Sequence, residues 1–160
     1  MAKIEIRPAL REDLRAIEGI FRSHDSRHDW KYAKKYYEDY FGSPEVYKGD
    51  GVLVAVREGR VVGVIGFNAD HYEANDIYWL GWFYVHREER GQEHGVRLLK
   101  HVIKSLKKRG GRKLYTDTSS YGFYDRAHRC YRERGFKAEA RLKDFYGKGE
   151  DQVIYGLKLS

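Results

Sequence analysis

One stretch decides the fold: Tyr84-Val85-His86-Arg87-Glu88-Glu89-Arg90-Gly91-Gln92-Glu93-His94-Gly95-Val96. The apolar run Ile77 to Val85 leads into it, and its composition predicts a strand that is buried on both faces. After it, apolar residues recur at helical spacing, which predicts an amphipathic helix over about 94–109. A buried strand therefore runs through a short turn directly into a long helix.

The turn between this strand and this helix is suited to an anion. The first turn of a helix leaves backbone N–H groups unpaired, and the helix dipole adds about half a positive charge there. Gly91 and Gly95 allow a ligand to come close to the backbone. A phosphate or pyrophosphate is the natural ligand, and the alternative is an ordinary strand–helix connection.

Hydrophobic spacing and turn residues predict the remaining elements. These are a strand over 3–7, helices over 11–23 and 30–41, a hairpin of strands 52–56 and 61–67, a strand over 114–118, a helix capped by Asp125 and ended by Gly135, and strands over 136–145 and 152–159. The order β α α β β β α β α β β predicts an α+β fold with a mixed central sheet and helices on its faces. No linker or repeat interrupts the chain, so we expect a single domain over residues 1–160.

Composition narrows the class of protein. The net charge of +7 indicates an anionic partner: nucleic acid, a membrane or a phosphorylated small molecule. The single cysteine, Cys130, excludes an internal disulfide and a cysteine-based zinc site, and it is expected in the core rather than as a nucleophile. The longest apolar stretch is far short of the roughly 20 residues that a membrane helix needs, and the N-terminus has no signal core. We therefore expect a soluble, cytoplasmic protein with no membrane partner.

Two motifs resemble those of the GNAT superfamily of acyl-CoA-dependent N-acetyltransferases. Arg90-Gly91-Gln92-Glu93-His94-Gly95 is similar to the family's Gln/Arg-x-x-Gly-x-Gly/Ala signature, with Glu93 in place of the middle glycine. Ala127-x-x-x-Tyr131-x-x-x-Gly135-Phe136 is similar to the family's Ala-x-x-x-Tyr-x-x-x-Gly-Phe signature, with Tyr124 at the position of a common Asn. The order of the predicted elements also resembles the GNAT (acyl-CoA N-acyltransferase) fold.

The resemblance implies acetyl-CoA as cosubstrate and assigns roles by position. The backbone of Phe83, Tyr84 and Val85 would pair with the pantetheine arm and hold the acetyl carbonyl. The pyrophosphate would be held by backbone N–H groups of Arg90, Gly91, Gln92, Glu93, His94, Gly95 and Val96. Tyr131 would lie near the CoA sulfur as the general acid, and Tyr124 is placed with the cofactor-binding residues.

The general base is less clearly indicated. An amine must be neutral to attack, whereas α-amino groups titrate near ~8 and lysine near ~10.4, so a base or a water relay should take the proton. Many relatives carry a Glu in the strand before the loop, but this chain has Trp79-Leu80-Gly81-Trp82. The candidates are Asp117, Asp76, Glu73 and His71, with a water relay as the alternative. The chemistry requires no metal.

Several other groups have a structural interpretation that competes with a functional one. His24, His28 and Asp29 are expected in a solvated loop, although in the family this region borders the acceptor site, and a metal site at His24 and His28 lacks a third ligand. The aromatic cluster is expected to pack in the core: Tyr32, Tyr36, Tyr37, Tyr40 and Phe41. The basic patch is expected to be a solvated helix face, or to hold the CoA 3′-phosphate: Lys100, Lys104, Lys107, Lys108, Arg109, Arg112 and Lys113. Residues 144–151 resemble the acceptor-side loop of ribosomal-protein N-terminal acetyltransferases.

The sequence thus predicts an N-acetyltransferase that moves an acetyl group from acetyl-CoA to a primary amine. The sequence leaves four classes of amine open: a protein N-terminus, a lysine, an amino acid or a small molecule. The alternative is a non-catalytic acyl-CoA-binding or nucleic-acid-binding module on the same fold. Nucleic acid is not the expected partner, because the aromatic residues follow core spacing rather than a stacking platform. A homodimer is compatible with the sequence.

Overall fold

The computed structural model describes residues 2–24, 27–70 and 76–160. Hydrogen bonding links seven strands in the order β1-β2-β3-β4-β5-β7-β6. The chain forms two compact units, Met1–Asn68 with Gly81–Val102 and Ala69–Leu80 with Ile103–Ser160. Strand β4 (Ile77–Val85) contributes its first residues to the second unit and its last residues to the first.

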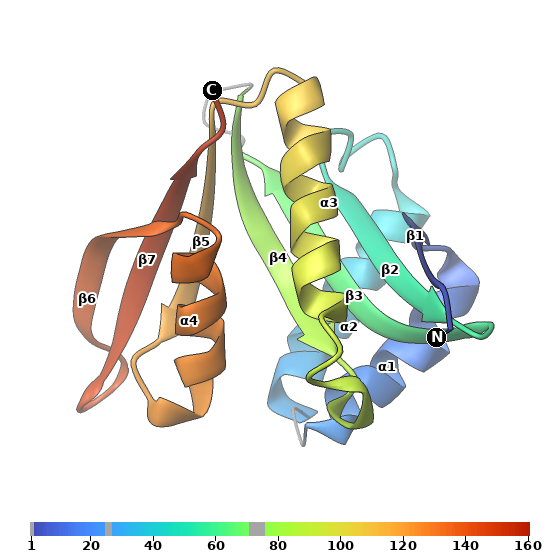
Figure 1. Ribbon diagram of the computed structural model, residues 1–160, viewed down its shortest axis with the longest axis horizontal. Coiled ribbons are helices and arrows are strands. Elements are labelled where there is room, and N and C mark those ends of the chain that lie inside the picture. The colour runs from blue at the N-terminus through green and yellow to red at the C-terminus, as the bar shows by residue number, and fades with distance from the viewer. Residues whose placement is uncertain (1, 25–26, 71–75) are drawn as a thin grey trace. The chain divides into compact units, whose positions relative to one another are not determined.

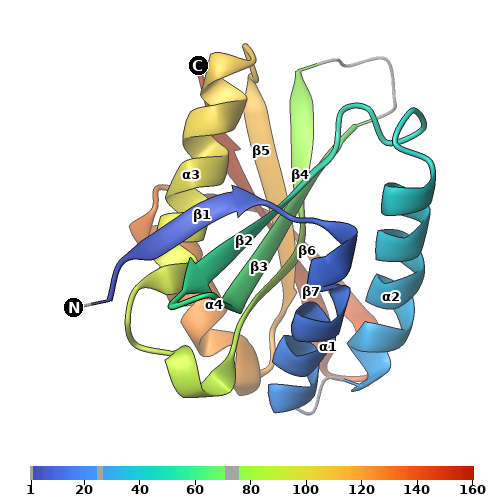
Figure 2. The same ribbon diagram turned by 90° about the vertical axis from the view of Figure 1, so that its right-hand side faces the viewer.

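The first unit is built on an antiparallel meander. Its strands are β1 (Ile4–Pro8), β2 (Gly51–Arg57) and β3 (Arg60–Ala69), with Ile6 opposite Ala55 and Leu53 opposite Ile65. Helices α1 (Leu14–Ser23) and α2 (Arg27–Gly42) lie side by side on one side of these strands, and the start of α3 (His94–Lys108) lies on the other (Figure 2). Glu58 and Gly59 have φ of 50° and 76°, as the tight hairpin turn between β2 and β3 requires.

The core of this unit lies between α1, α2 and the meander. It consists of Ile17, Phe21, Trp30, Ala33, Tyr37, Val52, Val54 and Val64, each with at most 8% of its surface exposed. Tyr36, Tyr40 and Phe41 pack against it, so the prediction that the aromatic segment serves packing is confirmed for these residues, whereas Tyr32 is exposed. On the other side, Leu98 of α3 lies directly over Gly63, where a Cβ would come within 3.0 Å of its Cδ1 atom.

The second unit combines an antiparallel sheet with one helix. Its strands are β5 (Lys113–Ser119), β6 (Lys137–Gly147) and β7 (Glu150–Lys158), and α4 (Asp125–Glu133) packs against them (Figure 1). The start of β4 adds a parallel strand, with Ile77 opposite Lys113 and Trp79 opposite Tyr115. Gly135, with φ of 93°, ends α4 as predicted.

A bulge in β6 shapes one end of this unit. Leu142 is paired with Gln152 and Gly147 with Glu150, so extra residues of β6 loop out between these pairs, and Asp144 adopts a φ of 54°. The buried carboxylate of Asp151 holds the loop: it accepts hydrogen bonds from the Asp144 N–H at 2.9 Å and from Arg141 Nε at 2.7 Å. These bonds lower the pKa of Asp151 to about 2. The bulge presents Phe145 and Tyr146 to solvent.

The predicted order of elements is confirmed, but two predictions are wrong. Strand β4 is not buried on both faces, because only Tyr78 and Leu80 are buried and its large aromatic side chains are covered in part. Asp125 is not the cap of α4; it is the first residue of the helix, after Tyr124. A 3-10 turn runs straight into the helix, and the Asp125 N–H binds the Gly122 carbonyl, so no side-chain cap is needed. Among the described residues, no helix is long and apolar enough to cross a membrane.

Candidate active site

The turn between β4 and α3 has the geometry of an anion-binding site. A short 3-10 turn, Arg87–Glu89, follows the strand, and the exposed residues after it include Gly91 with φ of 80° and Glu93 with φ of 63°. The Glu93 carbonyl accepts the Arg97 N–H at 3.0 Å, which makes Glu93 the residue that starts the helix. The N–H groups of the following turn have no intrahelical acceptor and carry the positive end of the helix dipole.

The two glycines of the turn have different tasks. A Cβ at Gly91 would meet no atom within 4 Å, so the backbone there faces open space. A Cβ at Gly95 would lie 3.4 Å from Phe83 Cζ and 3.4 Å from Val85 Cγ2. Gly95 therefore lets α3 lie close to β4, and the expectation that its backbone approaches a ligand stays a prediction. The open space beside the turn lies on the side of Gly91.

Glu93 stands in a backbone conformation that favours glycine. Its φ of 63° is in the left-handed region, which costs a non-glycine residue roughly 1–2 kcal/mol, against about 0.5–1 kcal/mol of extra chain entropy for glycine. We therefore expect Glu93→Gly to raise the free energy of unfolding by roughly 0.5–1 kcal/mol in urea denaturation. Acetyl-CoA should bind as tightly or more tightly, since a negative side chain is removed.

Glu88→Gly is the matched control for this change. It removes the same charge five residues earlier, but Glu88 is not among the residues with positive φ. Glycine there adds flexibility without relieving strain, so stability should fall. A Glu93→Gly protein less stable than the wild type would contradict the assignment of strain to Glu93.

His24, just after α1, and Asp29, in the first turn of α2, both contact the end of β4. The Tyr84 hydroxyl donates a hydrogen bond to Asp29, and the His24 ring donates from Nε2 to the Val85 carbonyl. Burial lowers the pKa of His24, which favours its neutral form. The sequence predicted that His24 and Asp29 lie in a solvated loop, and this prediction is wrong. Both side chains are hydrogen-bonded to polar groups of β4.

The metal interpretation of this connection gains no support. The side chain of His28 lies outside the described residues, so its pairing with His24 is not described. Within the described part of the chain, no group of three or more His, Cys, Asp or Glu side chains is arranged to hold a metal ion.

Tyr131 lies on the inner face of α4 with 6% of its surface exposed. Its ring packs against Phe136 at 5.4 Å and Tyr155 at 5.8 Å between ring centroids, and it forms a side-chain hydrogen bond with Thr116. Burial raises the pKa of Tyr131 to about 12, although the hydrogen bond with Thr116 opposes this shift. The hydroxyl is therefore protonated at neutral pH and able to donate a proton.

Asp117 follows Thr116 on β5, so its side chain points to the opposite face of the strand. It is exposed and accepts hydrogen bonds from the Tyr146 hydroxyl at 3.0 Å and from Gln152 Nε2 at 2.8 Å. Burial and the neighbouring Asp117 carboxylate raise the pKa of Tyr146 to about 12, so that hydroxyl keeps its proton. The bulge in β6 and the β7 strand thus hold a solvent-facing carboxylate in a fixed orientation.

Comparison with known proteins identifies the family. The family model "Acetyltransferase (GNAT) family" matches residues 10–136, which is most of the chain. The chain belongs to the GNAT acetyltransferase family. It is an acetyl-CoA-dependent acetyltransferase, and the resemblance seen in the two sequence motifs is confirmed. A search of curated protein sequences gave no match.

Solved structures share the GNAT fold along almost the whole chain. A protein of the GNAT family from Desulfovibrio desulfuricans is 24% identical to this chain. The TM-score is 0.88, and the match covers 99% of this chain and 100% of that one. The ribosomal-protein-S18-alanine N-acetyltransferase from Escherichia coli is 20% identical, with a TM-score of 0.80 and coverage of 99% and 95%. The protein yncA from Salmonella typhimurium, solved with its cofactor acetyl-CoA, is 21% identical, with a TM-score of 0.76 and coverage of 98% and 94%.

The residues predicted for the GNAT site fall into two groups. Phe83, Tyr84, Val85 and the turn 90–96 belong to the first unit, whereas Tyr124 and Tyr131 belong to the second. Tyr124 immediately precedes α4 and is half-buried, with its ring against Phe123. The roles of these residues in the GNAT reaction stay predictions.

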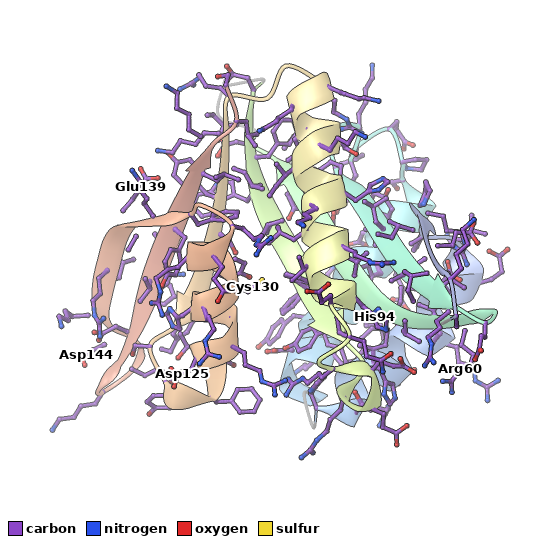
Figure 3. All side chains as sticks on the ribbon, in the orientation of Figure 1. Arg60, His94, Asp125, Cys130, Glu139 and Asp144 are labelled. Carbon is purple, nitrogen blue, oxygen red and sulfur yellow. The ribbon has the colours of Figure 1, made fainter. Side chains whose placement is uncertain are left out.

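The other candidates for a base or nucleophile in this GNAT chain are less suited. Asp76 is paired with Arg112, with 2.9 Å between Oδ2 and Nε, and this hydrogen bond lowers its pKa. Glu73 and His71 lie outside the described residues. Cys130, on α4 and labelled in Figure 3, is half-buried, and burial raises its pKa, which suits a packing role.

The basic patch of this GNAT chain is mostly a solvated face, as expected. Lys100, Lys104, Lys107, Lys108 and Arg109 are exposed. Arg112 pairs with Asp76, and Lys113 pairs with Glu139, with 2.6 Å between Nζ and Oε1. The predicted contact with the CoA 3′-phosphate stays a prediction for the exposed lysines.

Sequence reasoning missed several side chains of the site. Asp29, Tyr146 and Gln152 were not assigned contacts, because each meets its partner across a long sequence separation, 55 residues in the case of Asp29 and Tyr84. The buried carboxylate of Glu89 was also missed. A glutamate between two charged residues of a turn carries no pattern that marks it as buried.

Proposed function

We propose that this GNAT enzyme acetylates a primary amine, with Asp117 as general base and Tyr131 as general acid. The observation that carries the proposal is the alternation along β5. Thr116 points to one face and bonds Tyr131, while Asp117 points to the other face and is exposed to solvent. A proton acceptor and a proton donor are thus set on opposite faces of one strand.

This arrangement suits the two proton transfers of the reaction. The acceptor arrives largely as an ammonium ion and must lose a proton to attack, and an exposed carboxylate can take that proton. The nitrogen then forms a bond to the acetyl carbon, and the bond from that carbon to the CoA sulfur breaks. The thiolate leaves with the bonding electron pair and takes a proton from the Tyr131 hydroxyl. The nitrogen loses its second proton as the amide forms, and this proton returns to the Tyr131 oxygen through water. The nucleophile and the leaving group occupy different sides of the acetyl carbon, so a separate group for each is expected.

The turn before α3 would hold the pyrophosphate of acetyl-CoA. The N–H groups of the first turn of α3, the helix dipole and the open space beside Gly91 fit a large anion. The backbone of Phe83 and Tyr84 would pair with the pantetheine arm. Val85 would contribute mainly its N–H group, because its carbonyl already accepts a hydrogen bond from His24.

The acceptor is a primary amine of a protein N-terminus, a lysine, an amino acid or a small molecule. Two observations favour a protein N-terminus. The structural neighbour from Escherichia coli is named for acetylation of an alanine of ribosomal protein S18, and Phe145 beside Tyr146 is 54% exposed, as expected for a surface that meets a peptide.

A turnover screen tests the proposal. Thiol release from acetyl-CoA would be measured with peptides that have a free N-terminus, N-blocked peptides with one lysine, amino acids and polyamines. We expect release with at least one amine and the strongest release with free N-terminal peptides. Acetyl-CoA that binds but is not turned over with any amine would instead support the non-catalytic acyl-CoA-binding alternative.

A further inference from the structure

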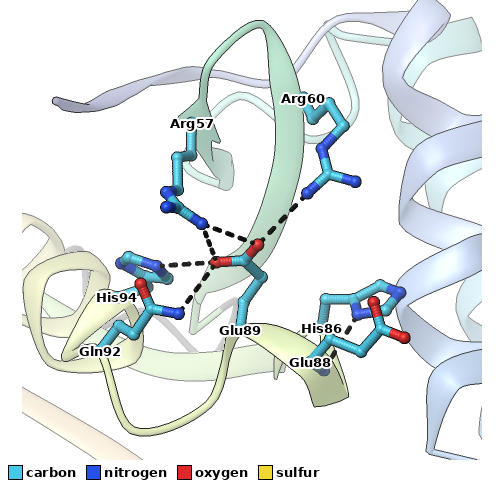
Figure 4. Close-up of polar contacts among 7 residues, drawn as sticks. All are labelled: Arg57, Arg60, His86, Glu88, Glu89, Gln92 and His94. Carbon is cyan, nitrogen blue, oxygen red and sulfur yellow. Dashed lines mark hydrogen bonds and ion pairs between the residues drawn. The ribbon is translucent and has the colours of Figure 1, made fainter. Parts of the chain in front are cut away.

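We infer that Glu89 is a positioning residue that holds the acetyl-CoA-binding turn in its active shape. The inference rests on the proposed location of the pyrophosphate at the start of α3. Glu89 ends the 3-10 turn after β4, and its carboxylate points from the turn toward Arg57 and Arg60 of the β2–β3 hairpin, with 7% of its side chain exposed (Figure 4). It was given no role by the GNAT motifs.

The Glu89 carboxylate contacts the turn on its helical side. His94 Nε2 lies 3.3 Å from Glu89 Oε2, and Gln92 Nε2 makes a longer contact of 3.5 Å with the same oxygen. Glu89 and His94 bracket the exposed residues 90–93. One carboxylate therefore ties together the two ends of the segment that would face the phosphates.

The same carboxylate is fixed to the β2–β3 hairpin. Arg57 Nη1 donates to both carboxylate oxygens at 3.2 Å, and Arg60 Nη2 lies 3.3 Å from Oε1. The Arg57 side chain is 30% exposed, and that of Arg60, labelled at the hairpin in Figure 3, is 72% exposed. A buried carboxylate is stable only with such partners, so the turn is joined to a rigid part of the first unit.

His94 gives a second indication that the turn is held by the Glu89 carboxylate. The residue is 4% exposed, and its Nδ1 atom is buried with no hydrogen-bond partner among the described residues. The ring therefore interacts through Nε2 alone, where the proton is donated to Glu89. The backbone N–H of His94 lies in the first turn of α3, where N–H groups have no intrahelical acceptor. The contact of its ring with Glu89 fixes the position of the residue and thereby the direction of this backbone N–H.

The turn needs such a restraint, because its own backbone does not favour the observed shape. Glu93 adopts a φ of 63°, in the left-handed region that glycine adopts without strain. Glu89 and its partners compensate by holding the residues on either side. Glu89 acts through the turn and does not contact the phosphates or the reacting atoms.

This inference makes a prediction opposite in sign to simple electrostatics. Glu89 is negative and lies near the expected pyrophosphate, and it also engages two arginines. If Glu89 acted only through its charge, Glu89→Gln would leave Arg57 and Arg60 without their carboxylate partner. The local positive charge would then increase, and acetyl-CoA would bind more tightly. If Glu89 positions the turn, the same change weakens binding, because a neutral amide replaces the acceptor of four side chains.

The test compares Glu89→Gln with Glu88→Gln by isothermal titration of acetyl-CoA and by steady-state kinetics. Glu88 is exposed, and its side chain has no part in the network, so the control removes the same charge one residue away. We expect Glu89→Gln to raise the Kd and KM for acetyl-CoA about tenfold, with kcat within about twofold of wild type, which one lost charge-assisted hydrogen bond would produce. Glu88→Gln should change the Kd by less than about twofold.

Arg60→Gln provides a second variant that is expected to fold, because its side chain is mostly exposed. We expect a Kd about threefold above wild type, and no further increase when Arg60→Gln is added to Glu89→Gln, since both act through one network. If Glu89→Gln binds acetyl-CoA as tightly as the wild type or more tightly, the inference is overturned. If Glu89→Gln does not fold, Arg60→Gln decides, and unchanged binding of acetyl-CoA by this variant overturns the inference. Wild-type protein that fails to bind acetyl-CoA would overturn the proposed function and this inference with it.

Discussion

Tyr131→Phe should lower kcat by about 10²-fold or more, while acetyl-CoA binding changes little. The change removes only the hydroxyl that would protonate the leaving thiolate, and the ring keeps its packing against Phe136 and Tyr155. The loss of the hydrogen bond with Thr116 should cost about 1–2 kcal/mol of stability. Single-turnover thiol release and urea denaturation measure the two effects separately.

Tyr155→Phe is the matched control for this loss of activity. Tyr155 is also buried, its hydroxyl lies 2.6 Å from His128 Nδ1, and its ring contacts Tyr131. Its hydroxyl has no place in the proposed chemistry, so Tyr155→Phe should lose similar stability but keep kcat within a few-fold. Equal kcat in Tyr131→Phe and wild type would remove Tyr131 from the mechanism.

The pH dependence of stability gives an independent check on Tyr131. Burial raises its pKa from 10.0 to about 12, so the folded state binds this proton more tightly than the unfolded state does. The resulting stability is fully present below about pH 10 and is lost as the pH rises towards about 12. Tyr131→Phe should show a smaller decline than the wild type, because it loses the contribution of Tyr131 and keeps that of other tyrosines with a raised pKa, such as Tyr146. The rate profiles of the two proteins should run parallel up to about pH 10, because the hydroxyl stays protonated over that range.

Asp117→Asn should lower kcat/KM by about 10²-fold or more if Asp117 takes the proton of the acceptor amine. An asparagine of the same size can still accept a hydrogen bond from Tyr146, so the bulge in β6 should keep its shape. The acid limb of the rate profile should disappear with the base that causes it. The remaining rate should rise with pH, because more of the amine is then neutral in solution.

Asp76→Asn is the control for Asp117→Asn. It removes a carboxylate that the sequence made an equal candidate, but one that is already paired with Arg112. We expect its kcat/KM to stay within about threefold of wild type. A large loss in Asp76→Asn with normal activity in Asp117→Asn would move the base from β5 to the start of β4.

The sequence predicted the order of elements because each depends on neighbours in the chain. The bounds of β4 and the start of α3 were correct, since an apolar run and a helical repeat are local patterns. The burial of β4 was not predicted correctly, because how much of a large ring is covered depends on what packs against it. The cap of α4 was also wrong, because the 3-10 turn before Asp125 supplies the hydrogen bond that a capping side chain would make.

By itself, the sequence determined the family and the cosubstrate and predicted the place of the phosphate turn, because these depend on short motifs whose residues are adjacent or one helical turn apart. Only the tertiary structure decided which polar side chains contact one another around the proposed site. Asp117 became the favoured base when Tyr146 and Gln152, distant in sequence, were found on its carboxylate. Glu89 gained a role only when Arg57 and His94 were found around it. A buried carboxylate is stable only with partners, and folding brings those partners from strands and turns that no local pattern connects.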